Sequence, residues 1–259
     1  MSRSHNKLRT MCLIVLIAVN VSELRSQSTT EMVSIPAGAF MMGTDTGSPD
    51  ERPVHIVELS SFLIDRTPVT KAQFALFLEA VGPVSPWGET YYEDDDSDAG
   101  IHQRVGSWVV VDPDLEDHPV LEVTWVGARD YCAWANKRLP TEAEWEKAAR
   151  GTDGRQYPWG NQAPDRTRAQ FSQGRAETSP VGRFPEGASP YGVLDLAGNA
   201  WEWLSSAYKL YPYDASDGRE NLDPGPVRMT RGGGHDSSAQ EIRSTERAQN
   251  ISRGFRCAM

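Results

Sequence analysis

The chain has 259 residues, of which 39% are hydrophobic, 24% charged and 9% aromatic, values typical of a globular protein with one large domain or two small ones. A formal net charge of -10 argues against nucleic-acid partners, because binding a phosphate backbone needs clustered lysine and arginine. The 22 glycines and 17 prolines, with few long apolar stretches, predict many turns and short elements.

The first 26 residues are organised like a signal peptide. Arg3, Lys7 and Arg9 precede an apolar stretch over residues 11–21, which is too short to span a bilayer. We therefore expect an exported protein, periplasmic or extracellular, with no stable membrane span and with cleavage near Ser26. An uncleaved, membrane-associated leader is the alternative. Cys12 lies at the start of the apolar stretch, not after it as a lipoprotein cysteine would, so no lipid anchor is expected.

Residues 27–31 are expected to be a short lead-in, and residues 32–259 a single folded domain. Residues 40–43 predict a strand that ends in a turn. Residues 54–59 alternate between apolar and polar side chains, which is typical of a half-buried strand.

Three helices are predicted to begin after Thr70, Thr124 and Thr141, each of which can cap a helix. The first and third also carry a glutamine or glutamate three residues later, which completes a capping box. The first helix has an apolar stripe of Phe74, Phe77, Leu78 and Val81, and the second has one of Ala128, Tyr131, Cys132 and Ala135. Gly151 is expected to end the third helix.

Acidic residues gather in residues 91–100. Like charges repel, so this stretch indicates a solvated loop, and the alternative of a cation site lacks the spacing of an EF-hand. Tryptophan is frequent, and burial of its indole can give a loop-rich domain its core. The core candidates are Trp125, Trp134, Trp145, Trp159, Trp201 and Trp203.

Short strings of residues along the chain point to one family. They include Pro68-Val69-Thr70, Leu139-Pro140-Thr141-Glu142-Ala143-Glu144-Trp145, Tyr157-Pro158-Trp159-Gly160-Asn161, Leu196-Ala197-Gly198-Asn199-Ala200-Trp201-Glu202-Trp203, Arg231-Gly232-Gly233 and Gly254-Phe255-Arg256-Cys257. In order and spacing they resemble the formylglycine-generating enzymes, also called sulfatase-modifying factors, over residues 32–258. The resemblance implies an α+β fold related to C-type lectins, with short strands, few helices and much irregular structure.

Only Cys132 and Cys257 remain after removal of a signal peptide. Two cysteines in an oxidising compartment favour one disulfide, with two buried thiols as the alternative. The resemblance also implies this pair, because the two positions match one bridge of the family.

The resemblance further implies a structural calcium ion. The family binds it through an acid or amide, two backbone carbonyls and a glutamate, at positions that correspond here to Asp195, Gly198, Ala200 and Glu202. Carboxylate and carbonyl oxygens on irregular backbone are what calcium prefers. The alternative is that Asp195 caps a turn and Glu202 forms a buried ion pair.

The family's copper ligands are missing. Its two copper-binding cysteines would fall near Ser237 and within residues 239–242, and its substrate-contacting serine falls at Gly234. Hydroxyl groups cannot replace the soft thiolates that select copper(I), so copper is not expected. Formylglycine generation is therefore not expected either.

The resemblance leaves a cleft without its cysteines, with Trp201, His235, Ser237 and Arg247 as candidate ligand contacts. We expect a monomer that binds a peptide or small molecule there. One alternative is an oxidoreductase acting on a periplasmic metabolite or a maturing protein. Another is formylglycine generation by a route independent of the cysteine pair. A catalytic triad of His235, Asp236 and Ser237 is not expected, because neighbours in sequence rarely converge on one atom.

Overall fold

Short strands and three α-helices, joined by long irregular segments, make up the chain over residues 30–95, 99–172, 178–223, 225–249 and 254–259, which the computed structural model describes. The helices are α2 (Lys71–Val81), α3 (Trp125–Trp134) and α4 (Glu142–Arg150). The 3-10 helices cover Pro49–Glu51, Pro113–Leu115 and Pro185–Gly187. This agrees with the α+β architecture that the resemblance implied.

Three antiparallel strand pairs and one larger sheet hold the fold together. The pairs are β1 (Met32–Ile35) with β4 (Phe62–Asp65), β2 (Gly38–Met42) with β3 (His55–Leu59), and β5 (Ile101–Arg104) with β6 (Ser107–Val110). The four-stranded sheet has the order β10 (Gly254–Phe255), β7 (Glu202–Ala207), β8 (Arg228–Arg231) and β9 (Ala248–Gln249). Only β10 runs parallel to its neighbour in this sheet.

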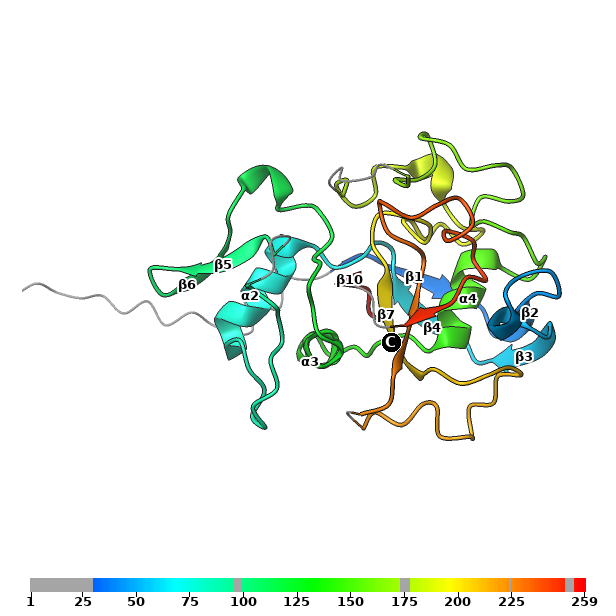
Figure 1. The fold of residues 1–259 in the computed structure, drawn as a ribbon, viewed down its shortest axis with the longest axis horizontal. Coiled ribbons are helices and arrows are strands. Elements are labelled where there is room, and N and C mark those ends of the chain that lie inside the picture. The colour runs from blue at the N-terminus through cyan, green and yellow to red at the C-terminus, as the bar shows by residue number, and fades with distance from the viewer. Residues whose placement is uncertain (1–29, 96–98, 173–177, 224, 250–253) are drawn as a thin grey trace, which may run out of the picture.

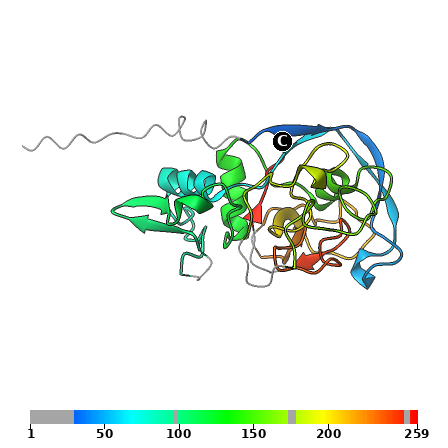
Figure 2. The ribbon, with the colours of Figure 1, turned by 90° about the horizontal axis from the view of Figure 1, so that it is seen from above.

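The elements separate into two packed regions. Figure 1 shows α2 and the β5–β6 hairpin on one side, and α4 with β2 and β3 on the other. Figure 2, turned by 90°, shows the same separation, with α3 between the two regions. Within the described residues no helix is both long enough and apolar enough to cross a membrane.

The helix caps follow the sequence. Thr70 accepts from Gln73 N–H at the start of α2, and Thr141 accepts from Glu144 N–H at the start of α4, both within full capping boxes. Thr124 caps α3 by accepting from Gly127 N–H. The apolar stripe of α2 is buried except at Val81, which is 43% exposed because it lies in the last turn, beyond the region that packs on α3.

The tryptophans form much of the core. Five of the six candidates are at most 9% exposed: Trp125, Trp134, Trp145, Trp201 and Trp203. Trp159 is only half-buried and packs against the buried cluster of Tyr157, Ala169, Ala197 and Ile242, so it lies at the edge of the core rather than inside it. It lies on the loop after α4, where Tyr157 stacks on its ring. The acidic side chains of residues 93–95 are exposed, as expected of a solvated loop, and residues 96–98 lie outside the described residues.

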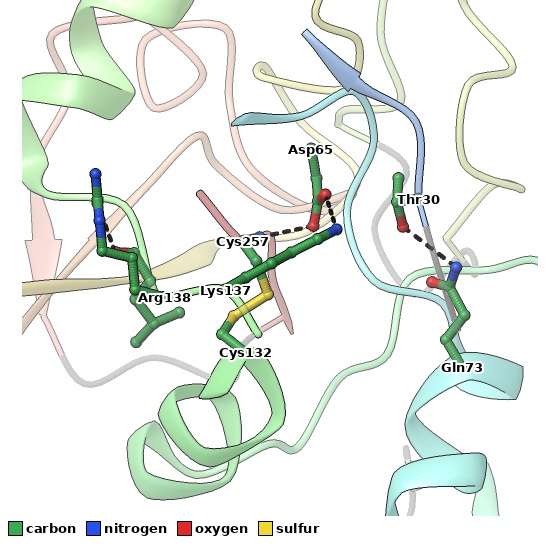
Figure 3. Close-up of a disulfide and its surroundings, with 8 residues drawn as sticks. Thr30, Asp65, Gln73, Cys132, Lys137, Arg138 and Cys257 are labelled. Atoms are coloured by element: carbon green, nitrogen blue, oxygen red, sulfur yellow. Dashed lines mark hydrogen bonds and ion pairs between the residues drawn. A yellow bond between two sulfur atoms is a disulfide. The ribbon is translucent and has the colours of Figure 1, made fainter. Parts of the chain in front are cut away.

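The expected disulfide between Cys132 and Cys257 is present, with Cα atoms 5.6 Å apart and both residues fully buried. It joins α3 to the last residues of the chain. Figure 3 shows Asp65 beside it, accepting from Lys137 Nζ and from the Cys257 N–H at 3.0 Å. The C-terminal segment also pairs with β4, since Asp65 N–H donates to Cys257 O and Leu63 N–H to Met259 O. The end of the chain is thereby fixed in the core.

Candidate functional site

The segment after β8 makes a tight turn. Gly234 N–H donates to Ser237 Oγ at 3.0 Å, and Ser237 N–H donates back to Gly234 O at 3.1 Å. Ser172 donates to Ser237 O from both its N–H and its hydroxyl. Ser237 is buried, and its hydroxyl is used to hold the turn.

Trp201 lies against this turn. A Cβ placed on Gly234 would be 3.4 Å from Trp201 Cδ1, in contact with the indole, and 2.9 Å from Asp236 Oδ1, which would have to move. His235 N–H donates to Asn199 O at 3.1 Å, which ties the turn to the segment before β7. The structure therefore brings Trp201 and the turn containing His235 and Ser237 together.

Arg247 lies elsewhere. Its guanidinium donates to both carboxylate oxygens of Glu142, at 2.7 and 3.2 Å, and to the backbone oxygens of Asp50 and Lys209. It also packs over Tyr211, 4.2 Å from the ring centroid. Among the described residues no contact joins Arg247 to Trp201 or to the Gly234 turn, and its role is to pair a buried glutamate.

In the stretch where the second family cysteine would fall, residues 239–242, the buried side chain is that of Ile242. Ile242 is fully buried in a cluster with Tyr157, Ala169 and Ala197. Its Cγ2 would be 2.6 Å from a Cβ on Gly233, so only glycine fits opposite it. The two bridged cysteines belong to a different hydrophobic cluster.

A buried network of ion pairs lies beneath β8 and was not anticipated from the sequence. Arg231 is fully buried and donates to Glu146 at 2.6 Å and to Tyr211 at 2.8 Å, with Glu142 at 3.1 Å. Burial alone would raise the pKa of Glu142, but Arg231 and Arg247 lower it below its ordinary value. In the sequence, the one signal for this buried ion-pair network was the number of acidic residues on the α4 segment. These contacts fix β8 to α4.

Asp195 and Glu202, the proposed calcium ligands, are both buried. Asp195 has a φ of 57° and accepts from Gly182 N–H at 2.6 Å. Burial raises the pKa of Asp195 to about 6, and the nearby charge of Glu202 adds to this rise. Glu202 pairs with Arg256 through two hydrogen bonds of 2.7 Å. Both contacts of the alternative to calcium binding are thus present: Asp195 accepts a hydrogen bond within a turn, and Glu202 forms a buried ion pair.

The backbone between these two carboxylates is tightly constrained. Gly198 has a φ of 78°, and a Cβ there would be 2.2 Å from Gln170 O, so this position requires glycine. Asn199 exchanges two hydrogen bonds with the backbone of Ser179, at 2.8 and 3.1 Å. No group of three or more His, Cys, Asp or Glu side chains suited to a metal occurs among the residues described. A metal here would therefore need backbone carbonyls as well.

Comparison with known proteins identifies relatives over nearly the whole chain. Residues 18–259 match the sulfatase-modifying factor enzyme 1-like domain. The formylglycine-generating enzyme of Thermomonospora curvata is 34% identical, over 88% of this chain and 92% of that enzyme. The serine/threonine-protein kinase pkn1 of Chlamydia caviae is 39% identical over 88% of this chain, which spans only 38% of that kinase.

The solved structure of PvdO from Pseudomonas aeruginosa resembles this fold. It superposes with a TM-score of 0.71 at 28% sequence identity, covering 90% of this chain and 95% of that one. The likeness therefore extends over both packed regions and is not confined to one motif.

Proposed function

Because this chain belongs to the sulfatase-modifying factor family, we propose that it is an exported member that binds a peptide or small molecule and does not generate formylglycine. The observation that carries the proposal is the replacement of both copper-binding cysteines. Ser237 stands near the first position, and residues 239–242 contain no cysteine.

The donor groups present argue against copper chemistry at this place. Copper(I) is selected by soft thiolates. The Ser237 hydroxyl is a hard donor that already accepts a hydrogen bond from Gly234, and Ile242 offers only hydrocarbon. The cysteines at 132 and 257 are bridged and buried, so neither supplies a free thiolate.

The surroundings of Trp201 support ligand binding. The Gly234 turn packs against the Trp201 indole, His235 is partly exposed, and the turn itself is held by paired hydrogen bonds. A pre-formed site of this kind costs little conformational entropy when a ligand binds. Arg247, which we had expected to contact the ligand, acts in this proposal only by pairing Glu142.

We further propose a structural calcium ion bound by Asp195, Glu202 and the carbonyl oxygens of Gly198 and Ala200. Glu202 Oε2 accepts from Trp145 and Arg256. From the described residues Oε1 accepts one hydrogen bond, and a carboxylate oxygen has two lone pairs. The raised pKa of Asp195 reflects a burial cost that a cation would offset. Calcium supplies no chemistry here beyond holding this segment.

The calcium proposal is tested by melting the full chain with calcium, with magnesium and with chelator. Binding to the folded state alone raises the melting temperature with calcium concentration. Calorimetric titration of Asp195→Ala gives a second measurement that does not depend on stability. A melting temperature that is the same with calcium and with chelator would rule the site out.

Formylglycine generation is the competing function, favoured by the 34% identity to an enzyme of that name. An activity assay distinguishes this function from the proposed one. The full chain is incubated with a peptide that bears a Cys-x-Pro-x-Arg motif, in the presence and absence of copper(I). The Thermomonospora curvata enzyme is the positive control, and mass spectrometry detects the aldehyde. We expect no conversion; aldehyde formed over several turnovers would contradict the proposal. Oxidation of another substrate would support the oxidoreductase alternative instead.

A further inference from the structure

A pocket of about 520 Å³ opens beside Trp159, in the loop that follows α4. It is lined by Asp153, Arg155, Trp159, Gly160, Asn161 and Gln162. This volume lies within the range of small-molecule sites. We propose that this pocket binds the ring of a neutral sugar, stacked on the Trp159 indole.

The pocket is pre-formed. Tyr157 and Gly160 exchange two backbone hydrogen bonds of 2.9 Å, and Trp159 Nε1 donates to Gln162 O at 3.0 Å. Asn161 Oδ1 accepts from Gln156 N–H at 2.8 Å. Because the loop is held by its own hydrogen bonds, little ordering is needed when a ligand enters.

Trp159 provides an aromatic platform. Its ring is stacked on Tyr157 with centroids 5.1 Å apart and an angle of 3° between the planes. Tyr157 fixes the indole from one side, through its place in the buried cluster and its hydrogen bond to Ala239 O. Trp159 is half-buried and lines the pocket. The polarised C–H groups on one face of a pyranose ring pack well against the electron-rich face of such a ring.

The charges in the pocket cancel. Arg155 donates to Asp153 from Nε at 2.9 Å and from Nη2 at 2.6 Å, so the guanidinium and carboxylate satisfy each other. A charged ligand would meet two charges that already offset each other, whereas a neutral ligand can hydrogen-bond to the exposed edges of the pair. This favours a neutral ligand over an anion or a quaternary ammonium ion.

Carboxamides supply the remaining polar contacts. Within the described part of the chain the Gln162 carboxamide has no hydrogen-bond partner, and it is exposed. An amide offers one acceptor and two donors, and a sugar hydroxyl can use both kinds. Gly160 has a φ of 127° and no side chain. A Cβ at this position would be 3.0 Å from Gln162 Oε1 and would crowd the carboxamide in the pocket. An aromatic platform edged by planar polar groups matches a ring with one apolar face and a rim of hydroxyls.

This site goes beyond the proposed function and stands apart from it. None of its lining residues contacts Trp201, His235 or Ser237 in the described structure, although the Tyr157–Ala239 hydrogen bond links the two loops. A Ser237→Ala variant is therefore expected to bind the sugar as the parent does. Failure of one site can be told from failure of the other.

Saturation-transfer NMR on the full chain tests the proposal. The probes are methyl α-glucopyranoside, methyl β-galactopyranoside and N-acetylglucosamine, each titrated to about 10 mM, because a ligand of this size binds weakly. We expect transfer to the ring C–H protons of at least one probe. Trp159→Ala should weaken binding at least about tenfold through loss of the stacking surface. Gln162→Ala, at an exposed position that no core contact needs, should weaken it several-fold.

Trp87→Ala is the matched control, because Trp87 is 79% exposed on a loop after α2 and should not affect binding. Absence of transfer to all three sugars would overturn the proposal. So would transfer that persists in both Trp159→Ala and Gln162→Ala. Choline and phenylalanine amide are added as competitors at a concentration equal to that of the sugar. If either displaces the sugar signal, the ligand is a cation or an aromatic side chain, and the sugar proposal is overturned.

Discussion

Asp195 is expected to make the calcium-free protein less stable as the pH rises. Burial raises its pKa from 3.8 to about 6 in the folded state. The folded protein therefore holds this proton more tightly than the unfolded chain does. The associated stability is complete below pH 3.8 and is lost as the pH rises through about 6. Since one pKa unit corresponds to about 1.4 kcal/mol, the cost of ionising Asp195 inside the fold reaches about 3 kcal/mol at neutral pH.

The perturbation is Asp195→Asn, which is neutral at every pH. Its side-chain oxygen can still accept from Gly182 N–H. Relative to the parent, the free energy of unfolding of this variant should rise by about 2 kcal/mol between about pH 4.5 and 7.5. Asp223→Asn, at an exposed carboxyl, is the matched control for loss of one negative charge.

The assay is urea unfolding with chelator at both pH values, repeated with calcium. With calcium at the higher pH the parent should gain stability and Asp195→Asn should gain less, because the ion binds the ionised carboxylate. A difference between variant and parent that does not change with pH would refute the buried-carboxylate argument. Equal effects of calcium on both proteins would leave that argument intact and refute Asp195 as a ligand.

Three further predictions concern stability. Replacing both Cys132 and Cys257 by serine should lower the free energy of unfolding by about 5 kcal/mol, measured by urea titration, because the bridge closes a loop with a sequence separation of 125. Arg231→Met removes one of the two arginines that pair with the buried Glu146, leaving Arg150, and should cost about 3 kcal/mol; an unchanged melting temperature would contradict that role. Thr141→Ala removes a helix cap and should cost about 1 kcal/mol by the same titration, with no loss of fold by circular dichroism.

Local sequence patterns were sufficient to predict the elements whose contacts join residues close together in the sequence. The start of α2 was predictable because Thr70 and Gln73 exchange hydrogen bonds with backbone only three residues away. The same reasoning applies to α3 and α4. The Cys132–Cys257 pairing was also within reach, since removal of the expected signal peptide would leave only this pair and the family resemblance matched it.

The surface or core position of a side chain was less predictable where the chain lacks periodic structure. Trp159 was expected in the core with the other tryptophans, because large apolar rings are usually buried. The structure has it half-buried on a loop, at the turn closed by Tyr157 and Gly160, where it packs on the edge of a buried cluster. No hydrophobic periodicity marks such a turn, so its direction could be seen only in three dimensions.

The buried charges were decided by the tertiary structure alone. All nine residues of α4 are buried, although five of them are charged, because arginines and backbone oxygens from distant segments meet them. Arg231 reaches Glu146 across 85 residues, and Arg247 reaches Glu142 across 105. A charge enters a low-dielectric interior only with its partner. The sequence by itself therefore determined the family, the helix starts and the missing thiolates, whereas the pairing of its buried charges depended on contacts that exist only once the chain has folded.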